Sequence, residues 1–560
     1  MPREKAVGLQ PGIFLVISAL PVIALTVAFI LPYAAAVSDG FTHFTRIVME
    51  NSVLRVLRFT IAQAAFSTLA ALTIGLPGAW LIGSGRFRGA RIVRAVASVP
   101  FAMPPILVVL GFVLFFGNNG WANKLIMNLT GAQEPPLRIL YRPEAIILAH
   151  AFYNFPIILR LVGDAIAKAR STYAPVASGL GASGSMTFLT VLVPIAFPSI
   201  AAAALLVFLY CFTSFAVVLV LGGGPGATTL PVEIYRAARI SLDYSTAGSL
   251  ALLETMIAAI AYLAYTRMEQ IARRVSGAND DRTRETAIQD RSNAARGSPI
   301  ANLLTIIYII AAMILVAGPI SAVVAESFLS RVTRTSFAQF SLRWWASIGS
   351  SAVPALIRSV LLAAAAATVS VFLASAAALA VWKAKAFTSP SMSRTSLYER
   401  AVSALCMAPL ASSGIVLGLG WLKLYGSGLA RSFWVVALAH AISALPFAYR
   451  SISEGLRSLP SQTAAASASL GAEPLTTAFR VALPSAAKRI RSAWAFAAAI
   501  SLGELNAVLM LGLENYETLP LLMYRAAGAY RFGAACAAGV LLAIACIAAF
   551  VLSEDTAHVD

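Results

Sequence analysis

The chain has 560 residues, of which 59% are hydrophobic and only 12% are charged. A soluble domain carries about a quarter charged residues, so this composition excludes a water-soluble globular protein. The net charge of +18 is not gathered in a separate polar domain that could bind nucleic acid. We therefore assign the basic residues to the cytoplasmic loops of a membrane protein and expect no nucleic-acid partner.

Twelve apolar segments are long enough to cross a lipid bilayer, which takes about 20 helical residues. They are rich in Ala, Gly and Ser, which let neighbouring helices approach closely in lipid. The sequence therefore predicts an all-α membrane protein with twelve transmembrane helices. The predicted spans are residues 12–35, 57–84, 95–117, 143–165, 195–221, 247–266, 299–325, 355–382, 400–425, 432–449, 487–511 and 532–552.

The positions of Lys and Arg set the expected orientation. With the N-terminus inside, the loops on that side hold more basic residues than those outside, which predicts that both termini are cytoplasmic. One polar stretch, 267–298, is charged, mixed in sign and poor in large apolar residues. We interpret it as a flexible cytoplasmic linker between a first half, 1–266, and a second half, 299–560.

The two halves repeat each other. AHAFYNFPIILR (149–160) matches AHAISALPFAYR (439–450), so that His440 lies 290 residues after His150. Further pairs fall in that register, which chance identity does not supply. Six spans separate equivalent points, so the halves are predicted to be two parallel six-helix repeats with a substrate path between them.

A loop before the fifth span of each half carries the most specific pattern. Both loops contain a helix of small residues, then Leu-Gly, then twelve residues and a proline. Glycine allows the backbone to reverse between two short helices. The residues of this pattern are Gly181 and Pro194 in the first half, and Gly471 and Pro484 in the second.

This duplicated loop resembles the EAA loop of bacterial ABC importer permeases, although the glutamate of the name-giving triplet is absent. The resemblance implies that each loop holds a coupling helix that docks on an ATPase subunit. The chain lacks the G-x-x-x-x-G-K-[ST] phosphate loop, so we expect no enzymatic activity of its own. Two copies of a separate ATPase subunit and a periplasmic substrate-binding protein are the implied partners in the bacterial inner membrane. We expect no cofactor and no metal.

Longer stretches are similar to the permeases of thiamine importers. They are ILAHAFYNFPIILRL (147–161), FTSFAVVLVLGGGPGATTLPVEIYRAA (212–238), ISLGELNAVLML (500–511) and ETLPLLMYRAAGAYR (517–531). This similarity implies thiamine, or thiamine phosphates, as cargo. Ferric-iron permeases share the loop and remain an alternative. Major-facilitator transporters form a different class with twelve spans, but the loop 83–94 lacks the aspartate of their usual motif.

Ionisable residues within the spans are candidates for the substrate path, because a charge costs about 3 kcal/mol to insert near mid-membrane. Glu504 lies in the eleventh predicted span, where contact with a cationic substrate and a hydrogen bond between helices are equally consistent with the sequence. Glu254 has no acidic counterpart in the other half, and we interpret it as a packing residue. His150 and His440 are expected to form hydrogen bonds between helices.

Overall fold

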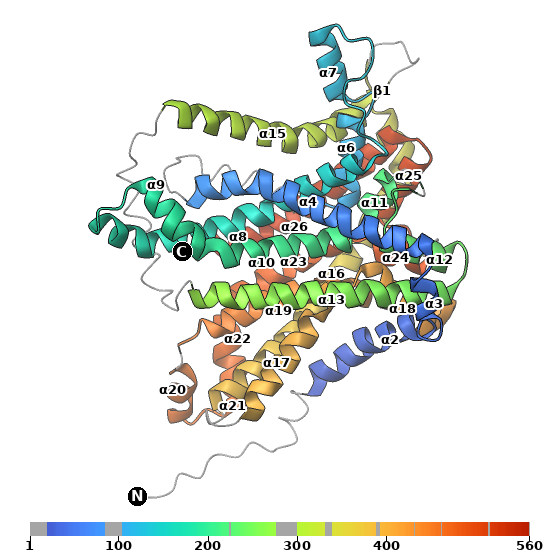
Figure 1. The fold of residues 1–560 in the computed structure, drawn as a ribbon. Coiled ribbons are helices and arrows are strands. Elements are labelled where there is room, and N and C mark those ends of the chain that lie inside the picture. The colour runs from blue at the N-terminus through green and yellow to red at the C-terminus, as the bar shows by residue number, and fades with distance from the viewer. Residues whose placement is uncertain are drawn as a thin grey trace, which may run out of the picture.

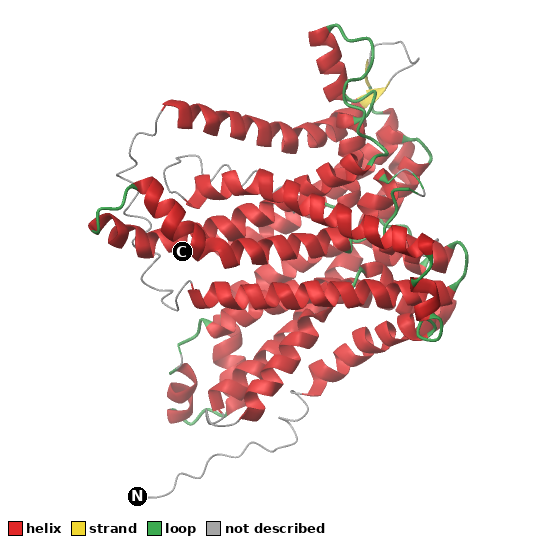
Figure 2. Cartoon of the chain, viewed as in Figure 1, coloured by secondary structure: helices red, strands yellow, loops and turns green. Residues whose placement is uncertain are grey.

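Backbone groups inside a bilayer cannot bond to water, so the apolar segments must satisfy their hydrogen bonds internally as helices. The computed structural model has this form, with long helices that run side by side (Figures 1 and 2). Within the described residues, the strands are the two-residue β1 (Leu329–Ser330) and β2 (Gln339–Phe340), which pair antiparallel. The predicted all-α membrane fold is confirmed. The structure describes residues 19–83, 103–222, 224, 226–275, 299–330, 339–387, 393–429, 432–460, 462–512 and 516–558.

The first half contains short helices between its long ones. Its elements are a π-helical turn (Thr26–Ile30), α2 (Leu31–Ser38), α3 (Phe44–Val48), α4 (Asn51–Gly83), α6 (Pro105–Phe116), α7 (Trp121–Thr130), α8 (Pro143–Gly179), α9 (Gly184–Thr187), a π-helical turn (Phe188–Leu192), α10 (Val193–Phe212), α11 (Ala216–Leu221), α12 (Leu230–Arg239) and α13 (Tyr244–Val275).

The second half follows the same plan. Its helices are α15 (Pro299–Phe328), α16 (Arg343–Phe387), α17 (Ser393–Met407), a 3-10 turn (Ala408–Ala411), α18 (Gly414–Leu429), α19 (Phe433–Arg457), α20 (Thr463–Ser469), α21 (Pro474–Thr477), a π-helical turn (Ala478–Ala482), α22 (Leu483–Ser485), α23 (Ala487–Leu502), α24 (Asn506–Leu511), α25 (Leu519–Gly528) and α26 (Phe532–His558).

Ten helices in the described residues are long and apolar enough to cross a membrane. A further apolar pair, Leu397–Ala411 and Gly414–Gly426, meets at 101° and forms either a broken span or a re-entrant loop. The eleventh predicted span, 487–511, is not one long helix. A turn at Ala486 separates α22 from α23, and a second break separates α23 from α24. The starts of the spans predicted at 12–35 and 95–117 lie outside the described residues.

The repeat in the sequence is also a repeat in backbone geometry. The π-helical turns Phe188–Leu192 and Ala478–Ala482 lie 290 residues apart, as do α11 and α24. Leu242 and Tyr530 both have positive φ, at 56° and 58°, immediately before the last helix of each half. The two halves therefore share bends and turns as well as helices.

The last helix of the first half, α13, begins at a side-chain cap. Asp243 accepts hydrogen bonds from the backbone N–H of Thr246 at 3.0 Å and from its hydroxyl at 2.7 Å. These bonds, the backbone bond first, hold the pKa of Asp243 below its usual value. At its other end α13 remains helical to Val275, beyond the predicted start of the linker at 267. Residues 276–298 of that linker lie outside the described residues.

The first membrane-spanning helix of each half packs against a helix of the other half. α2 of the first half packs against α18 of the second, and α15 of the second packs against α6 of the first. Each crossing uses a glycine against a proline. A β-carbon at Gly420 would lie 1.8 Å from the carbonyl oxygen of Pro32, and one at Gly111 would lie 2.8 Å from that of Pro319. Small residues therefore allow both contacts between the halves.

This geometry makes Gly420→Ala a test of the interface. The added methyl group cannot fit without moving a backbone, so we expect the variant to lose about 1–3 kcal/mol of stability. Gly349→Ala is the matched control, because a β-carbon there meets nothing within 4 Å on an exposed part of α16. Thermal unfolding of the purified protein in detergent measures both. Equal melting temperatures for the two variants would contradict the close packing of α2 on α18.

Candidate functional site

Each loop with the Leu-Gly pattern contains a helix that ends at a glycine. Gly181 and Gly471 both have φ of +81°, which L side chains rarely adopt. The backbone N–H of Ala182 donates to the carbonyl of Ala177 at 3.0 Å, and that of Ala472 donates to Ser467 at 3.1 Å. This six-to-one bond closes a Schellman motif in both loops, so the two reversals predicted from sequence are built alike.

The prolines of the pattern stand where each loop leads back into a long helix. Pro194 and Pro484 each follow a π-helical turn by one residue. At the end of these turns, the N–H of Val193 bonds to Phe188 and that of Leu483 bonds to Ala478. Because proline cannot donate a backbone hydrogen bond, a locally widened helix accommodates it without a full break.

The leucine before each glycine points away from the bundle. Leu180 is 84% exposed and Leu470 is 88% exposed. α9, α20 and α21 lie at one end of the bundle, and α3, α12 and α25 lie at the other (Figure 1). Two equivalent apolar side chains thus stand uncovered at one end of the molecule. Exposed apolar groups of this kind mark contact surfaces when they occur together.

Glu504 lies in the break between α23 and α24. One of its carboxylate oxygens, Oε1, accepts hydrogen bonds from the backbone N–H groups of Asn506 at 2.8 Å and Ala507 at 3.3 Å. The equivalent break in the first half lies between α10 and α11 and has Ser214 in place of the acid. Glu504 therefore orders a helix start that the first half builds without a carboxylate.

Both histidines form hydrogen bonds between helices, as expected. His150 Nε2 lies 2.9 Å from the hydroxyl of Ser214, and His440 Nδ1 lies 2.8 Å from that of Ser501. The other ring nitrogen of His440 is buried without a hydrogen-bond partner in the described residues. The second half has Glu504 where the first half has Ser214. His440 therefore bonds to Ser501, whereas its equivalent His150 bonds to Ser214.

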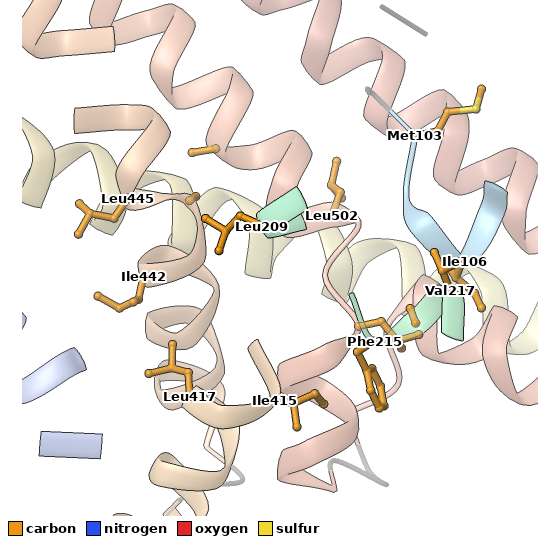
Figure 3. Close-up of a cluster of buried hydrophobic side chains, with 14 of the residues drawn as sticks. Met103, Ile106, Leu209, Phe215, Val217, Ile415, Leu417, Ile442, Leu445 and Leu502 are labelled. Carbon is orange, nitrogen blue, oxygen red and sulfur yellow. The ribbon is translucent and has the colours of Figure 1, made fainter. Parts of the chain in front are cut away.

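Glu504 lies at its own helix break and close to the break before α18. A β-carbon at Gly414 would lie 3.4 Å from Glu504 Oε1, and one at Gly503 would lie 3.2 Å from Pro104 of the first half. Apolar side chains surround these breaks, and ten of them are labelled in Figure 3: Met103, Ile106, Leu209, Phe215, Val217, Ile415, Leu417, Ile442, Leu445 and Leu502. Gly503, the neighbour of Glu504, thus lies against the first half.

A network of charges connects α13 of the first half to α19 of the second. Arg450 donates to the hydroxyl of Tyr265 at 2.8 Å and forms an ion pair with Glu269. Arg273 pairs with Glu269 at 3.1 Å and lies 3.6 Å from Glu454. Two cations and two carboxylates therefore neutralise each other across the border between the halves.

Two tyrosines interact electrostatically with Glu504 or with this network. Tyr153 on α8 lies within electrostatic range of Glu504, and Tyr210 on α10 lies within range of Tyr153, Tyr265 and Arg450. Their rings can offer π faces to a cation. Tyr153 and Tyr210 lie far apart along the chain, so the sequence alone does not reveal that both belong to this region.

The chain belongs to a family of membrane transport components. The family model described as "Binding-protein-dependent transport system inner membrane component" matches residues 72–277 and 376–555, one stretch in each half. Together with the long apolar helices, this match defines a multi-pass protein of the inner membrane.

Curated relatives of one kind match nearly the whole chain. The thiamine transport system permease protein of Brucella suis biovar 1 (strain 1330) is 29% identical over 513 residues, covering 91% of this chain and 88% of the relative. That of Salmonella typhimurium (strain LT2) is 27% identical and covers 98% and 96%. That of Escherichia coli (strain K12) is 27% identical and covers 90% of each.

The ion pair between Arg450 and Glu269 predicts a measurable coupling energy. In a double-mutant cycle of Arg450→Gln and Glu269→Gln, we expect a coupling energy of about 1 kcal/mol in thermal unfolding, because both side chains are mostly covered. Arg138 and Glu134 form an ion pair whose side chains are more than half exposed, and they serve as the control pair. Coupling no larger than in this control would show that the network does not hold the halves together.

Proposed function

We propose that this protein is the membrane-spanning permease of an ATP-driven thiamine importer. The observation that carries the proposal is the match to thiamine transport permeases over 90% or more of this chain. Membership of the binding-protein-dependent family removes the major-facilitator alternative. No observation on this chain favours ferric iron over thiamine.

The two reversed loops are the proposed docking sites for two copies of a separate ATPase subunit. Because each half carries one such loop, each half would bind one ATPase subunit. Leu180 and Leu470 would enter an apolar groove of the ATPase, and Gly181 and Gly471 would hold the reversal that presents them. ATP hydrolysis then resides on those subunits. Pro194 and Pro484 would transmit the movement into α10 and α23.

The proposed orientation puts these loops in the cytoplasm. The end of the bundle that carries α9 and α20 is then the inner side, and the end with α12 and α25 would receive the periplasmic binding protein (Figure 1). Both termini and the linker 267–298 would be cytoplasmic, between the halves 1–266 and 299–560. The excess of basic residues on this side supports the assignment.

The substrate path would run between the halves past Glu504. Thiamine carries a fixed positive charge, and a cation that leaves water needs a carboxylate or an aromatic face in return. Glu504 would supply the first and Tyr153 the second. The charge network of Arg450 and Glu269 would close the cytoplasmic end, and movement of the halves would open it.

Docking through the leucines can be tested without changing the fold of the loops. We expect the double variant Leu180→Ser, Leu470→Ser to lose roughly tenfold or more of its transport-coupled ATP hydrolysis, because two exposed apolar anchors are removed. Leu129→Ser on α7 is the control, since this side chain is 77% exposed at a distance from both loops. Hydrolysis is measured on the reconstituted complex. Normal coupling in the double variant would contradict the docking assignment.

The function itself is tested by thiamine uptake in cells that cannot make thiamine and lack their own importer. The wild-type protein with its partner subunits should restore uptake, and Glu504→Gln should reduce it roughly tenfold. Glutamine keeps the size and the acceptor that caps α24, so only the charge is lost. Glu50→Gln on an exposed residue is the control. Transport of ferric iron without thiamine by the wild type would reject the substrate.

A further inference from the structure

Glu254 is a buried acid at a position where helix packing does not require a charged residue. It lies in the middle of α13 with 0% exposure, and neither carboxyl oxygen has a hydrogen-bond partner in the described residues. An unpaired acid in a membrane helix is unfavourable and marks a functional position unless packing explains it. The sequence suggested packing, so the surroundings of Glu254 decide between the two interpretations.

The repeat supplies an internal comparison. Leu242 and Tyr530, the residues with positive φ before the last helices, are 288 residues apart, and the same register aligns Glu254 with Leu542. Leu542 is also 0% exposed. The equivalent helix of the second half therefore packs with a leucine at this place. Helix packing does not explain the acid in the first half.

Two polar groups next to Glu254 belong to the other half of the protein. They are the hydroxyl and the backbone N–H of Ser413, which lie close without forming a hydrogen bond of normal geometry. Ser413 lies in the break of the span that bends by 101°, directly before Gly414. Tyr33 of α2 lies within electrostatic range of Glu254 as well.

Glu504 reaches the same break from another side. Its Oε1 would lie 3.4 Å from a β-carbon on Gly414, whereas Glu254 lies against Ser413. Two carboxyl groups, one from each half, thus flank consecutive residues of one helix break. The repeat equivalents of both acids, Leu542 and Ser214, carry no charge.

We propose that Glu254 and Glu504 form a binding site for one organic cation at the Ser413–Gly414 break. This inference rests on the proposed thiamine import and specifies where the permease would hold the charged ring. A bound cation would partner the otherwise unpaired oxygens of Glu254. Because Glu254 and Ser413 belong to different halves, separation of the halves opens the site.

The structure suggests a variant that should fold. Glu254→Leu copies the residue at the equivalent position of α26, so the helix should still pack. We expect thiamine uptake per assembled complex to fall roughly tenfold or more, the usual scale for loss of a charged contact. Glu254→Asp, which keeps the charge, should retain more uptake than Glu254→Leu. Glu134→Leu on an exposed residue of the α7–α8 connection is the control.

Wild-type uptake by Glu254→Leu would overturn the site while leaving thiamine import intact. A wild-type complex that imports no thiamine would instead reject the proposed function. The two failures are therefore distinguishable in one assay.

A second measurement does not depend on the folding of a Glu254 variant. Ser413→Cys is placed in a protein whose four native cysteines are replaced by alanine, and alkylation of the new thiol is followed in the assembled complex. Thiamine should protect the thiol, and its neutral derivative thiochrome should not. Equal labelling with and without thiamine would overturn the site. Equal protection by Na⁺ would overturn the assignment to an organic cation.

Discussion

The close crossing of glycine against proline between the two halves is the contact on which the rest of the molecule depends. Gly420 lies against the backbone of Pro32, and Gly111 lies against that of Pro319. In lipid no hydrophobic effect drives helices together, so association relies on close packing and polar contacts. Because α2 packs on the second half and α15 packs on the first, the halves are in contact at two equivalent points. The region between these points can then carry breaks and polar groups.

This arrangement allows the helices in the interior to be broken. Non-helical backbone is tolerated at membrane depth only where protein or a lined cavity surrounds it. The breaks after α10 and α23 and before α18 all lie in the interior, among the apolar side chains of Figure 3. Their free backbone groups are satisfied locally, as at α24, where Glu504 accepts from two N–H groups. An interior built of broken helices is also one that small movements of the halves can rearrange.

Sequence patterns predicted the helices, the repeat and both reversed loops, because each depends on local chemistry. Apolar length predicts a span, and Leu-Gly before a proline predicts a reversal. The patterns did not predict the bend before Gly414 or the turn at Ala486, because each lies within or next to a predicted span that was taken as one helix. They made Glu504 a candidate for the substrate path but gave Glu254 only a packing role. The contact of Glu254 with Ser413 joins residues far apart in the chain, and no periodicity records it.

A duplicated fold separates structural needs from functional ones. Equivalent positions in the two halves face nearly the same packing problem, so matching residues such as Gly181 and Gly471 meet a common structural need. Where equivalent buried positions differ in charge, helix packing alone does not explain the charged residue. Glu254 against Leu542 and Glu504 against Ser214 are differences of this kind. Such differences would fix one orientation of a single asymmetric ligand on a pseudo-two-fold axis, because a symmetric pair of acids would offer it two equal positions. The departures from symmetry therefore point to the substrate path more directly than the repeat does.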